Sequence, residues 1–193
     1  ACTTTTGWNT TTSGANSTSY SACYQTQTPS GCASGTIKRS ASSISGTTIT
    51  YGAASVTGTL SANKNYFVSG TSCPACTTLG SFYTTSAGGA IASGSCYGTT
   101  TGGKYIKTQN SSTQETCPAG SYCPATNVYY GNYDTTGGRT PCGVGTANPN
   151  TGQSSASACS TCAAGTYFND TKTECLACTE NHYCLGGTKA PTA

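Results

Sequence analysis

Apolar residues are scarce in this chain, and where they occur they alternate with small polar residues. Between Cys32 and Cys73 the alternating positions are Ile44, Ile49, Tyr51, Val56, Leu60, Tyr66 and Val68, and glycines interrupt them at Gly46, Gly52, Gly58 and Gly70. Short runs of β-branched and aromatic residues bounded by glycine are typical of strands. No window shows the 3.6-residue rhythm of an amphipathic helix. The pattern predicts a Thr/Ser-rich β part over residues 1–72, sandwich-like or solenoid-like; a Thr-rich, glycosylated stalk is the alternative.

From Cys73 onward the chain is quasi-repetitive. Four imperfect copies of a Cys–small–Gly–x–Tyr theme begin near Cys73, Cys117, Cys159 and Cys175. Modules of this size cannot bury a core alone and must stack on their neighbours. We therefore expect a transitional cysteine-containing module over residues 73–116, followed by cysteine-rich repeat modules over residues 117–193. The predicted fold class is mainly β and irregular, with small disulfide-stapled modules after the β-rich N-terminal part.

Cysteine is the most informative residue type. The chain of 193 residues has fourteen cysteines, an even number that permits complete pairing. Disulfides persist in oxidising compartments, so this count indicates an extracellular protein that is secreted, held at a cell surface or built into a filament. The cysteines expected in disulfides are Cys2, Cys23, Cys32, Cys73, Cys76, Cys96, Cys117, Cys123, Cys142, Cys159, Cys162, Cys175, Cys178 and Cys184.

Zinc is the main alternative to disulfides. Cys159, Cys162, Cys175 and Cys178 have nearly the spacing of a zinc ribbon, and four thiolates bind zinc tetrahedrally. The ten further cysteines favour disulfides. We expect a Cys162–Cys175 bond, with Cys159 and Cys178 joining neighbouring modules. A redox dithiol at Cys73 and Cys76 lacks the strand–helix context of thioredoxin-like motifs.

The segments Cys117–Pro124 (Cys-Pro-Ala-Gly-Ser-Tyr-Cys-Pro) and Cys162–Phe168 (Cys-Ala-Ala-Gly-Thr-Tyr-Phe) resemble cysteine-rich ephrin-receptor-like or growth-factor-receptor-like repeats. Such repeats occur in surface proteins of protists and algae, including ciliate immobilisation antigens and proteins of flagellar hairs, the mastigonemes. The phrase from Tyr183 to Thr192 is similar to a linker between copies in these proteins. The resemblance covers residues 71–193, and it implies a role in coating a surface or building an extracellular filament.

Charge is sparse and unevenly distributed. Only 7% of the residues are charged and the net charge is +3, too weak to indicate nucleic-acid binding. All acidic residues follow residue 114, so the first part of the chain is basic and the last part is weakly acidic. This asymmetry either arises by chance in a chain with few charges or reflects a contact between the basic end of one copy and the acidic end of another. The second reading predicts head-to-tail self-assembly.

Membrane and processing signals are also informative. No stretch approaches the roughly 18 apolar residues of a membrane span, and no signal-peptide pattern is present. The chain starts at Ala1-Cys2, and the residues after Cys184 contain no motif that marks the end of a protein. We therefore expect an excised unit of a longer chain.

Covalent glycans are expected in a secreted chain of this composition. N-glycosylation sequons begin at Asn9, Asn16, Asn110 and Asn169. Candidate O-glycan positions are Thr3, Thr4, Thr5, Thr6, Thr10, Thr11 and Thr12. Because Ser and Thr make up about a third of the chain, several sequons arise by chance, and plain exposed polar segments are an equal reading of the threonine runs.

Catalysis has little support. His182 is the sole histidine, the five acidic residues show no paired-carboxylate pattern, and no phosphate loop or calcium motif is present. We therefore predict no catalytic residues, no metal, no cofactor and no enzyme activity. Thirteen tyrosines and Trp8 provide flat faces for stacking sugars, although disulfide packing accounts for most of the later tyrosines.

The sequence favours an extracellular structural protein, a repeating subunit of a glycosylated filament or cell-surface coat. The alternative is an adhesin module that binds carbohydrate or a surface. A small cysteine-rich signalling or inhibitor domain is a third reading.

Overall fold

The chain folds into two units built from strands, irregular loops and 3-10 turns. The computed structural model describes residues 1–12, 19–131, 136–188 and 191–192, and these include no α-helix. The first unit comprises residues 1–79 and 84–96, and the second comprises residues 80–83 and 97–193. The expected class, mostly strand and irregular structure stapled by disulfides, is confirmed.

The first unit contains β1 (Asn9–Thr12), β2 (Cys23–Gln27), β3 (Cys32–Ser45), β4 (Thr48–Tyr51) and β5 (Ser55–Ala62). Its 3-10 turns are η1 (Tyr20–Ala22), η2 (Cys76–Leu79) and η3 (Ser93–Ser95). The second unit contains β6 (Tyr97–Thr99), β7 (Lys104–Ile106), β8 (Gln114–Thr116), β9 (Ser121–Tyr122), β10 (Asn127–Tyr129), β11 (Thr140–Pro141), β12 (Thr146–Ala147), β13 (Ser160–Thr161), β14 (Thr166–Phe168) and β15 (Cys175–Ala177), with η4 (Ala156–Ala158).

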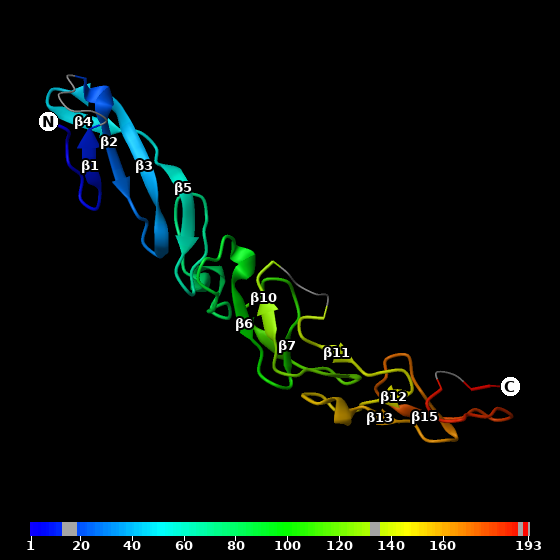
Figure 1. Cartoon of the computed structure of the whole chain (residues 1–193). Coiled ribbons are helices and arrows are strands. Elements are labelled where there is room, and N and C mark those ends of the chain that lie inside the picture. The colour runs from blue at the N-terminus through cyan, green and yellow to red at the C-terminus, as the bar shows by residue number, and fades with distance from the viewer. Residues whose placement is uncertain (13–18, 132–135, 189–190, 193) are drawn as a thin grey trace. The chain divides into compact units, whose positions relative to one another are not determined.

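The five strands of the first unit form one antiparallel sheet around β3 (Figure 1). β2 pairs with the middle of β3, with Gln25 opposite Arg39, and β1 pairs with β2. β4 and then β5 pair with β3, Ile49 lying opposite Ile44 and Val56 opposite Ile37. The sheet is open, so the sandwich-like or solenoid-like arrangement of residues 1–72 stays a prediction.

A small apolar core lies where the sheet meets the loops that follow it. It consists of Cys32, Ile37, Leu60, Ala62 and Cys73, and Trp8, Ala54, Tyr66 and Val68 pack against it. The backbone approaches closely here: a side chain at Gly31 would overlap the carbonyl oxygen of Cys73 and the ring of Tyr66. Glycine therefore permits the contact between the sheet and the loop after it.

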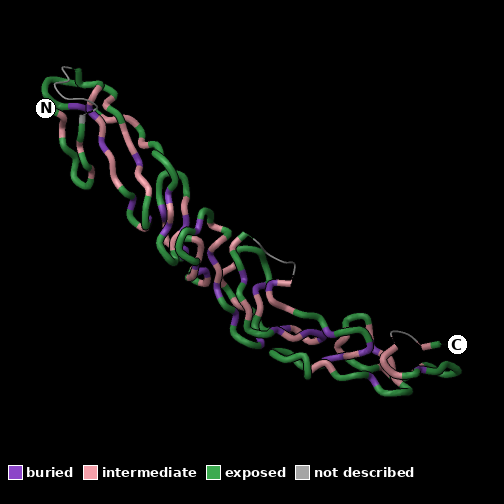
Figure 2. The backbone as a smooth tube through the Cα atoms, in the orientation of Figure 1, coloured by how far each residue is buried: buried purple, intermediate pink, exposed green. Residues whose placement is uncertain are grey.

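The second unit forms no extended sheet in its residues 97–131 and 136–188. Its ten strands pair into five separate antiparallel two-stranded ribbons, β6 with β10, β7 with β8, β9 with β11, β12 with β13 and β14 with β15. Figure 2 shows buried residues scattered along these ribbons. Two- and three-residue strands cannot bury a large apolar face, so other contacts must hold this unit together.

One seven-residue motif recurs along the chain, and we call it the turn segment. Its first and seventh residues are mostly buried, and its fourth residue has a positive φ. The six copies are Ala62–Val68, Thr100–Ile106, Cys117–Cys123, Cys142–Asn148, Cys162–Phe168 and Cys178–Cys184. The fourth residue is Asn65, Gly103, Gly120, Gly145, Gly165 or Asn181, with φ between 61° and 83°. Glycine and asparagine are the residues that adopt this conformation most readily.

The turn segments make the same backbone hydrogen bonds. In the second unit, the carbonyl oxygen of the fourth residue accepts from the amide that begins the next segment: Cys117 donates to Gly103, Cys142 to Gly120, Cys162 to Gly145 and Cys178 to Gly165, with N–O distances of 2.8, 2.9, 3.1 and 2.9 Å. In the first unit Cys76 donates to Asn65 in the same way, at 2.9 Å. In the second unit, each of these four segments is thus connected to the start of the one after it.

The seventh residue of each of five turn segments donates its amide to a later loop. The acceptors of Val68, Ile106, Cys123, Asn148 and Phe168 are the carbonyl oxygens of Ala90, Gly137, Gln153, Lys172 and Thr188. The predicted module over residues 73–116 is divided between the two units, because Cys73 is bonded to Cys32 and the amides of Asn65, Val68 and Gly89 bind residues 86, 90 and 62.

Candidate functional sites on the two units

The disulfides are the dominant chemical feature. All fourteen cysteines are paired, and every bond joins two cysteines that are consecutive in the sequence. The pairs are Cys2–Cys23, Cys32–Cys73, Cys76–Cys96, Cys117–Cys123, Cys142–Cys159, Cys162–Cys175 and Cys178–Cys184. The loops therefore follow one another without nesting or overlap. The expected Cys162–Cys175 bond is present, while Cys159 pairs back to Cys142 and Cys178 pairs forward to Cys184.

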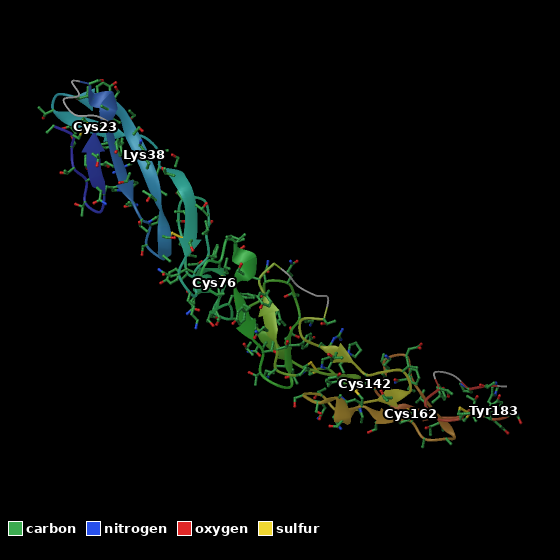
Figure 3. The ribbon with its side chains drawn as sticks, viewed as in Figure 1. Cys23, Lys38, Cys76, Cys142, Cys162 and Tyr183 are labelled. Atoms are coloured by element: carbon green, nitrogen blue, oxygen red, sulfur yellow. A yellow bond between two sulfur atoms is a disulfide. The ribbon has the colours of Figure 1, made fainter. Side chains whose placement is uncertain are left out.

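Disulfides occupy the interior in place of large apolar side chains. Cys76, Cys96, Cys117, Cys123, Cys142 and Cys162 are at most 1% exposed. Figure 3 labels three of them, Cys76, Cys142 and Cys162, along the ribbon. The bonds Cys117–Cys123 and Cys178–Cys184 join the first and seventh residues of one turn segment. The sulfurs of the zinc-ribbon pattern belong to three different disulfides, so that set of thiolates does not exist here.

A polar cluster holds the N-terminal segment on the five-stranded sheet. The Gln25 side chain is fully buried, and its Nε2 donates to the Thr3 carbonyl and to the hydroxyls of Thr5 and Thr10. Its Oε1 accepts from Arg39 Nε at 2.9 Å. The Arg39 guanidinium in turn lies 4.1 Å from the centre of the Trp8 ring.

Trp8 therefore has a structural explanation. Its ring packs against the apolar core, and the Arg39 guanidinium lies over the ring. This is a cation–π arrangement, which favours arginine over lysine. Thr3 completes the connection, because its carbonyl accepts from the Tyr51 hydroxyl at 2.9 Å and its own hydroxyl accepts from the Ile49 amide at 2.9 Å. The contacts of Trp8 therefore support a role in anchoring the first sheet.

The sequons differ in how far their asparagine side chains are engaged. Asn9 is exposed on β1, and within the described residues no hydrogen bond of its side chain is found. Asn110 is exposed and its Oδ1 accepts from the Gly131 amide at 2.8 Å. Asn169 is half-buried and both of its side-chain polar atoms are bonded within its own loop. Asn16 lies outside the described residues.

The threonine runs divide in a similar way. The hydroxyls of Thr3, Thr5 and Thr10 accept hydrogen bonds in the Gln25 cluster, although Thr5 is itself exposed. Thr4, Thr6 and Thr11 are exposed, and no hydrogen bond of their hydroxyls is found among the described residues. The side chain of Thr12 is outside the described part of the structure. The engaged hydroxyls point into the cluster, so Thr4, Thr6 and Thr11 are the better placed O-glycan candidates.

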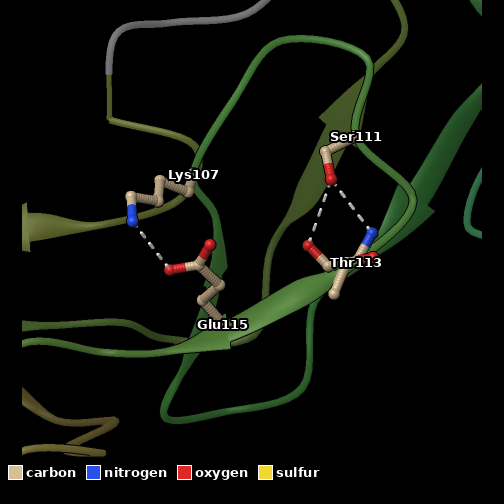
Figure 4. A network of polar contacts seen from close by, with 4 residues as sticks. All are labelled: Lys107, Ser111, Thr113 and Glu115. Carbon is tan, nitrogen blue, oxygen red and sulfur yellow. Dashed lines mark hydrogen bonds and ion pairs between the residues drawn. The ribbon is translucent and has the colours of Figure 1, made fainter.

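The loop between β7 and β8 presents Asn110. Figure 4 shows Lys107 Nζ facing Glu115, 3.4 Å from its Oε2, and the Ser111 hydroxyl accepting from the Thr113 amide. Both members of the ion pair are exposed, so it contributes at most about 1 kcal/mol. Gln109 Nε2 donates to the Gly131 carbonyl at 3.2 Å and, with Asn110, fixes the loop on its neighbour.

A polar cavity lies beside the ribbon of β6 and β10. Its volume is about 300 Å³, its lining includes Asn127, Tyr129, Thr136 and Thr140, and none of the lining residues that the structure describes is charged. The Tyr129 ring is 39% exposed and lies 5.0 Å from the Tyr97 ring, its cross-strand partner. An aromatic face beside amide and hydroxyl groups is an arrangement that can bind a neutral polar ligand.

Groups suited to acid–base or metal chemistry are dispersed. The exposed His182 ring lies 2.9 Å from the Glu180 carbonyl oxygen through Nδ1. Among the residues that the structure describes, no group of three or more His, Cys, Asp and Glu side chains could hold a metal ion. Within that same part of the chain, no helix is long and apolar enough to cross a membrane.

Comparison of the chain with protein-family models, with curated protein sequences and with solved structures returns no match. Arguments about its role therefore rest on the chain itself: its disulfides, its turn segments and the chemistry of its surface. The seven disulfides are typical of a secreted or extracellular protein.

Proposed function

We propose that this protein is an extracellular structural protein, a repeating subunit of a glycosylated filament or cell-surface coat. The observation that carries the proposal is the serial pairing of all fourteen cysteines along a chain whose turn segments, in the second unit, bind one another in sequence. Such an arrangement distributes covalent restraint evenly instead of concentrating stability in one apolar core. A structural protein with few apolar residues needs covalent restraint along its whole length. An enzyme needs, in addition, a preorganised site.

Serial loops support resistance to unfolding and to proteolysis. Each disulfide restrains its own stretch of the unfolded chain, and a loop such as Cys162–Cys175, with a sequence separation of 13, contributes about 3 kcal/mol on the chain-entropy model. Because the loops do not overlap, opening one leaves the others closed. Damage at one position therefore stays local, which suits a material exposed outside the cell.

Charge supports head-to-tail contact between copies. The first unit carries Lys38, Arg39 and Lys64 and no acidic residue. Lys38 lies over the Tyr24 ring at 4.0 Å, while Lys64 is exposed. The last part of the second unit carries three exposed acids, Asp170, Glu174 and Glu180. A heterologous contact between these surfaces does not close on itself and propagates as a fibre.

Electron microscopy and sedimentation of the secreted, non-reduced protein test this function. At low salt, about 0.02 M, we expect polymers, and at about 0.5 M salt we expect fewer of them because exposed charges are screened. Lys64→Glu should weaken polymerisation, and Glu180→Lys in the same chain should restore part of it. A fully disulfide-bonded protein that stays monomeric at every salt concentration would refute the filament proposal.

The alternative function, an adhesin module that binds carbohydrate, is favoured by the cavity beside β6 and β10. The lining residues in the described part of the chain are uncharged, and they and the Tyr129 face suit a neutral sugar. We expect an adhesin to give saturable binding of a neutral oligosaccharide by the monomer, and Tyr129→Ala to abolish it. Tyr105→Ala, a change on β7 outside the cavity lining, serves as the control. Absence of binding on a broad glycan array would exclude this alternative.

A further inference from the structure

Among the described residues, no strand pairs with the outer edge of the five-stranded sheet, although the Cys2 sulfur lies 3.9 Å from the Thr11 carbonyl oxygen. β1 is the outermost strand and pairs only with β2 among the described residues. An edge strand presents unpaired amides and carbonyls that can pair with another chain, and proteins usually block such edges with lysine, proline or a bulge. β1 has the sequence Asn-Thr-Thr-Thr, which contains none of these residues.

The sequon on β1 is arranged for modification. Residues two apart in a strand point to the same face, so Asn9 and Thr11 share a face while Thr10 points toward Gln25. Asn9 and Thr11 are both exposed. The amide that receives the sugar and the hydroxyl that completes the sequon therefore face solvent together.

The Asn169 sequon has the opposite geometry. Asn169 Oδ1 accepts from the amides of Thr173 and Glu174 at 2.8 and 3.4 Å. Its Nδ2 donates to Thr173 Oγ1 at 2.9 Å and to Glu174 Oε1 at 3.4 Å. A glycan on Nδ2 would replace one of these donors and insert a sugar into the loop. Folding would then lose the side-chain contacts that organise residues 169–174.

Asn110 is intermediate between these two sites. Its Oδ1 bond to the Gly131 amide survives glycosylation, because the sugar is attached to Nδ2. Asn110 is exposed in the loop between β7 and β8, outside the residues that pair in these two strands. A glycan at Asn110 would therefore be tolerated without protecting a strand.

We propose that Asn9 carries an N-linked glycan and that this glycan shields the outer edge of the sheet. The inference rests on the proposed function, since it requires secretion. Attachment forms a bond between Asn9 Nδ2 and the anomeric carbon of the sugar as the bond from that carbon to a polyprenyl pyrophosphate donor breaks. The amide proton passes to a base of the transferase, and the lipid pyrophosphate leaves.

Site-specific glycopeptide mapping of protein secreted from eukaryotic cells tests the attachment, with Asn16→Gln introduced throughout so that the neighbouring sequon does not contribute. We expect a glycan on Asn9 that peptide-N-glycosidase removes, and its loss in Thr11→Ala, which keeps Asn9. Asn169→Gln should leave the glycan mass unchanged. Protein secreted with all cysteines paired but bare at Asn9 would overturn the inference alone, whereas a chain retained in the cytosol with free thiols would overturn the proposed function.

A matched pair of variants tests the shielding. Asn9→Gln lacks the glycan and leaves the edge uncharged, whereas Asn9→Lys lacks the glycan but supplies an edge charge. By light scattering at about 0.5 M salt, where charge-driven filament contacts are weak, we expect Asn9→Gln to associate and Asn9→Lys to remain as dispersed as the glycosylated protein. Equal behaviour of Asn9→Gln and the glycosylated protein would refute edge shielding.

Discussion

At the scale of single residues, two buried polar side chains determine local stability. The Gln25 side-chain amide donates hydrogen bonds to the N-terminal segment and accepts one from Arg39. These polar contacts hold the N-terminal segment on the sheet, where a small sheet usually has an apolar contact. Tyr83 is fully buried in the second unit, and its hydroxyl donates to the Ser111 carbonyl at 3.1 Å. Both side chains pack against neighbours while their polar atoms are hydrogen-bonded.

Gln25→Leu should destabilise the first unit by about 1–3 kcal/mol, because it removes the partner of Arg39 Nε and the donor to three oxygens. Trp8, the single tryptophan, reports the transition in urea through its fluorescence. Gln27→Leu, the next position on the same face of β2, is the control and should change the unfolding free energy by less than about 0.5 kcal/mol. Equal losses for both variants would contradict the role of the cluster.

Alkaline pH should destabilise the second unit through Tyr83. Burial raises the pKa of Tyr83 above its ordinary value of 10.0, and repulsion from Tyr130 adds to this. A raised pKa means that the fold favours the neutral phenol. This stability is fully present below pH about 10 and is lost as pH rises through the higher pKa of the folded state.

The test compares urea unfolding at pH about 9 and about 11 in the parent protein and in Tyr83→Phe. The variant loses the bond to Ser111, about 1 kcal/mol at neutral pH, and its stability should fall less between the two pH values. Tyr183→Phe, at an exposed tyrosine, is the control. Identical pH dependence in Tyr83→Phe and the parent would show that Tyr83 does not carry the effect.

At the scale of elements, the turn segment is the repeating unit, and its fourth residue always has a positive φ. The surroundings of that position vary. A side chain on Gly103 would overlap the carbonyl oxygen of Gly152, whereas one on Gly165 would meet nothing within 4 Å. Asn181 has a φ of 61° at the equivalent place, which shows that the conformation itself tolerates a side chain.

Gly103→Ala and Gly165→Ala form a matched pair at equivalent positions. Gly165→Ala should cost only the strain of a positive φ, about 1–2 kcal/mol. Gly103→Ala should cost clearly more, about 3 kcal/mol or above, because the backbone of Gly152 must also move. Hydrogen exchange at the Cys117 amide, which donates to Gly103, should accelerate in Gly103→Ala alone. Equal costs would mean that backbone conformation, and not the close approach, governs these glycines.

At the scale of the whole molecule, serial pairing of the cysteines divides the chain into covalently independent stretches. No disulfide spans residues 97–116 or residues 124–141. In any other connectivity with a disulfide across one of these stretches, the segments on its two sides would be covalently linked. The connectivity is therefore open to a direct chemical test that needs no structure.

Trypsin digestion in urea, with thiols blocked and without reductant, should yield three separate disulfide-containing pieces: residues 1–38 linked to 65–104, residues 108–139, and residues 140–189. Lys104, Lys107 and Arg139 lie between disulfides. Cuts after Lys38, Arg39 and Lys64 fall inside the Cys32–Cys73 loop and free residues 40–64, which contain no cysteine, while residues 1–38 and 65–104 stay linked until reductant is added. The cut after Lys172 falls inside the Cys162–Cys175 loop and releases nothing until reductant is added. Mass spectrometry before and after reduction distinguishes the two cases. Recovery of any two of the three pieces as one linked species would refute serial pairing.

Several properties follow from the sequence alone. The sparse apolar residues between glycines led to the strand and loop class, because short alternating runs cannot form helices. The Cys162–Cys175 bond was also predictable, since the two residues bracket a single short module. The repeat was recognised only in part. Its theme was tied to cysteine, so the turn segments beginning at Ala62 and Thr100 were missed, although a glycine or asparagine three residues later was the available signal.

Other properties were decided by tertiary structure. The partner of Cys32 is Cys73, and residues 73–79 and 84–96 belong with the first sheet, because backbone bonds between distant loops place them there. The burial of Gln25 and the exposure of Asn9 depend on which strands become neighbours and which strand is outermost. The content of apolar residues determines how much of a chain can be buried, and the number and spacing of cysteines determine how far disulfides must stabilise it. Pairing between distant segments determines which individual side chains face the interior, because that choice depends on sheet register and not on local sequence.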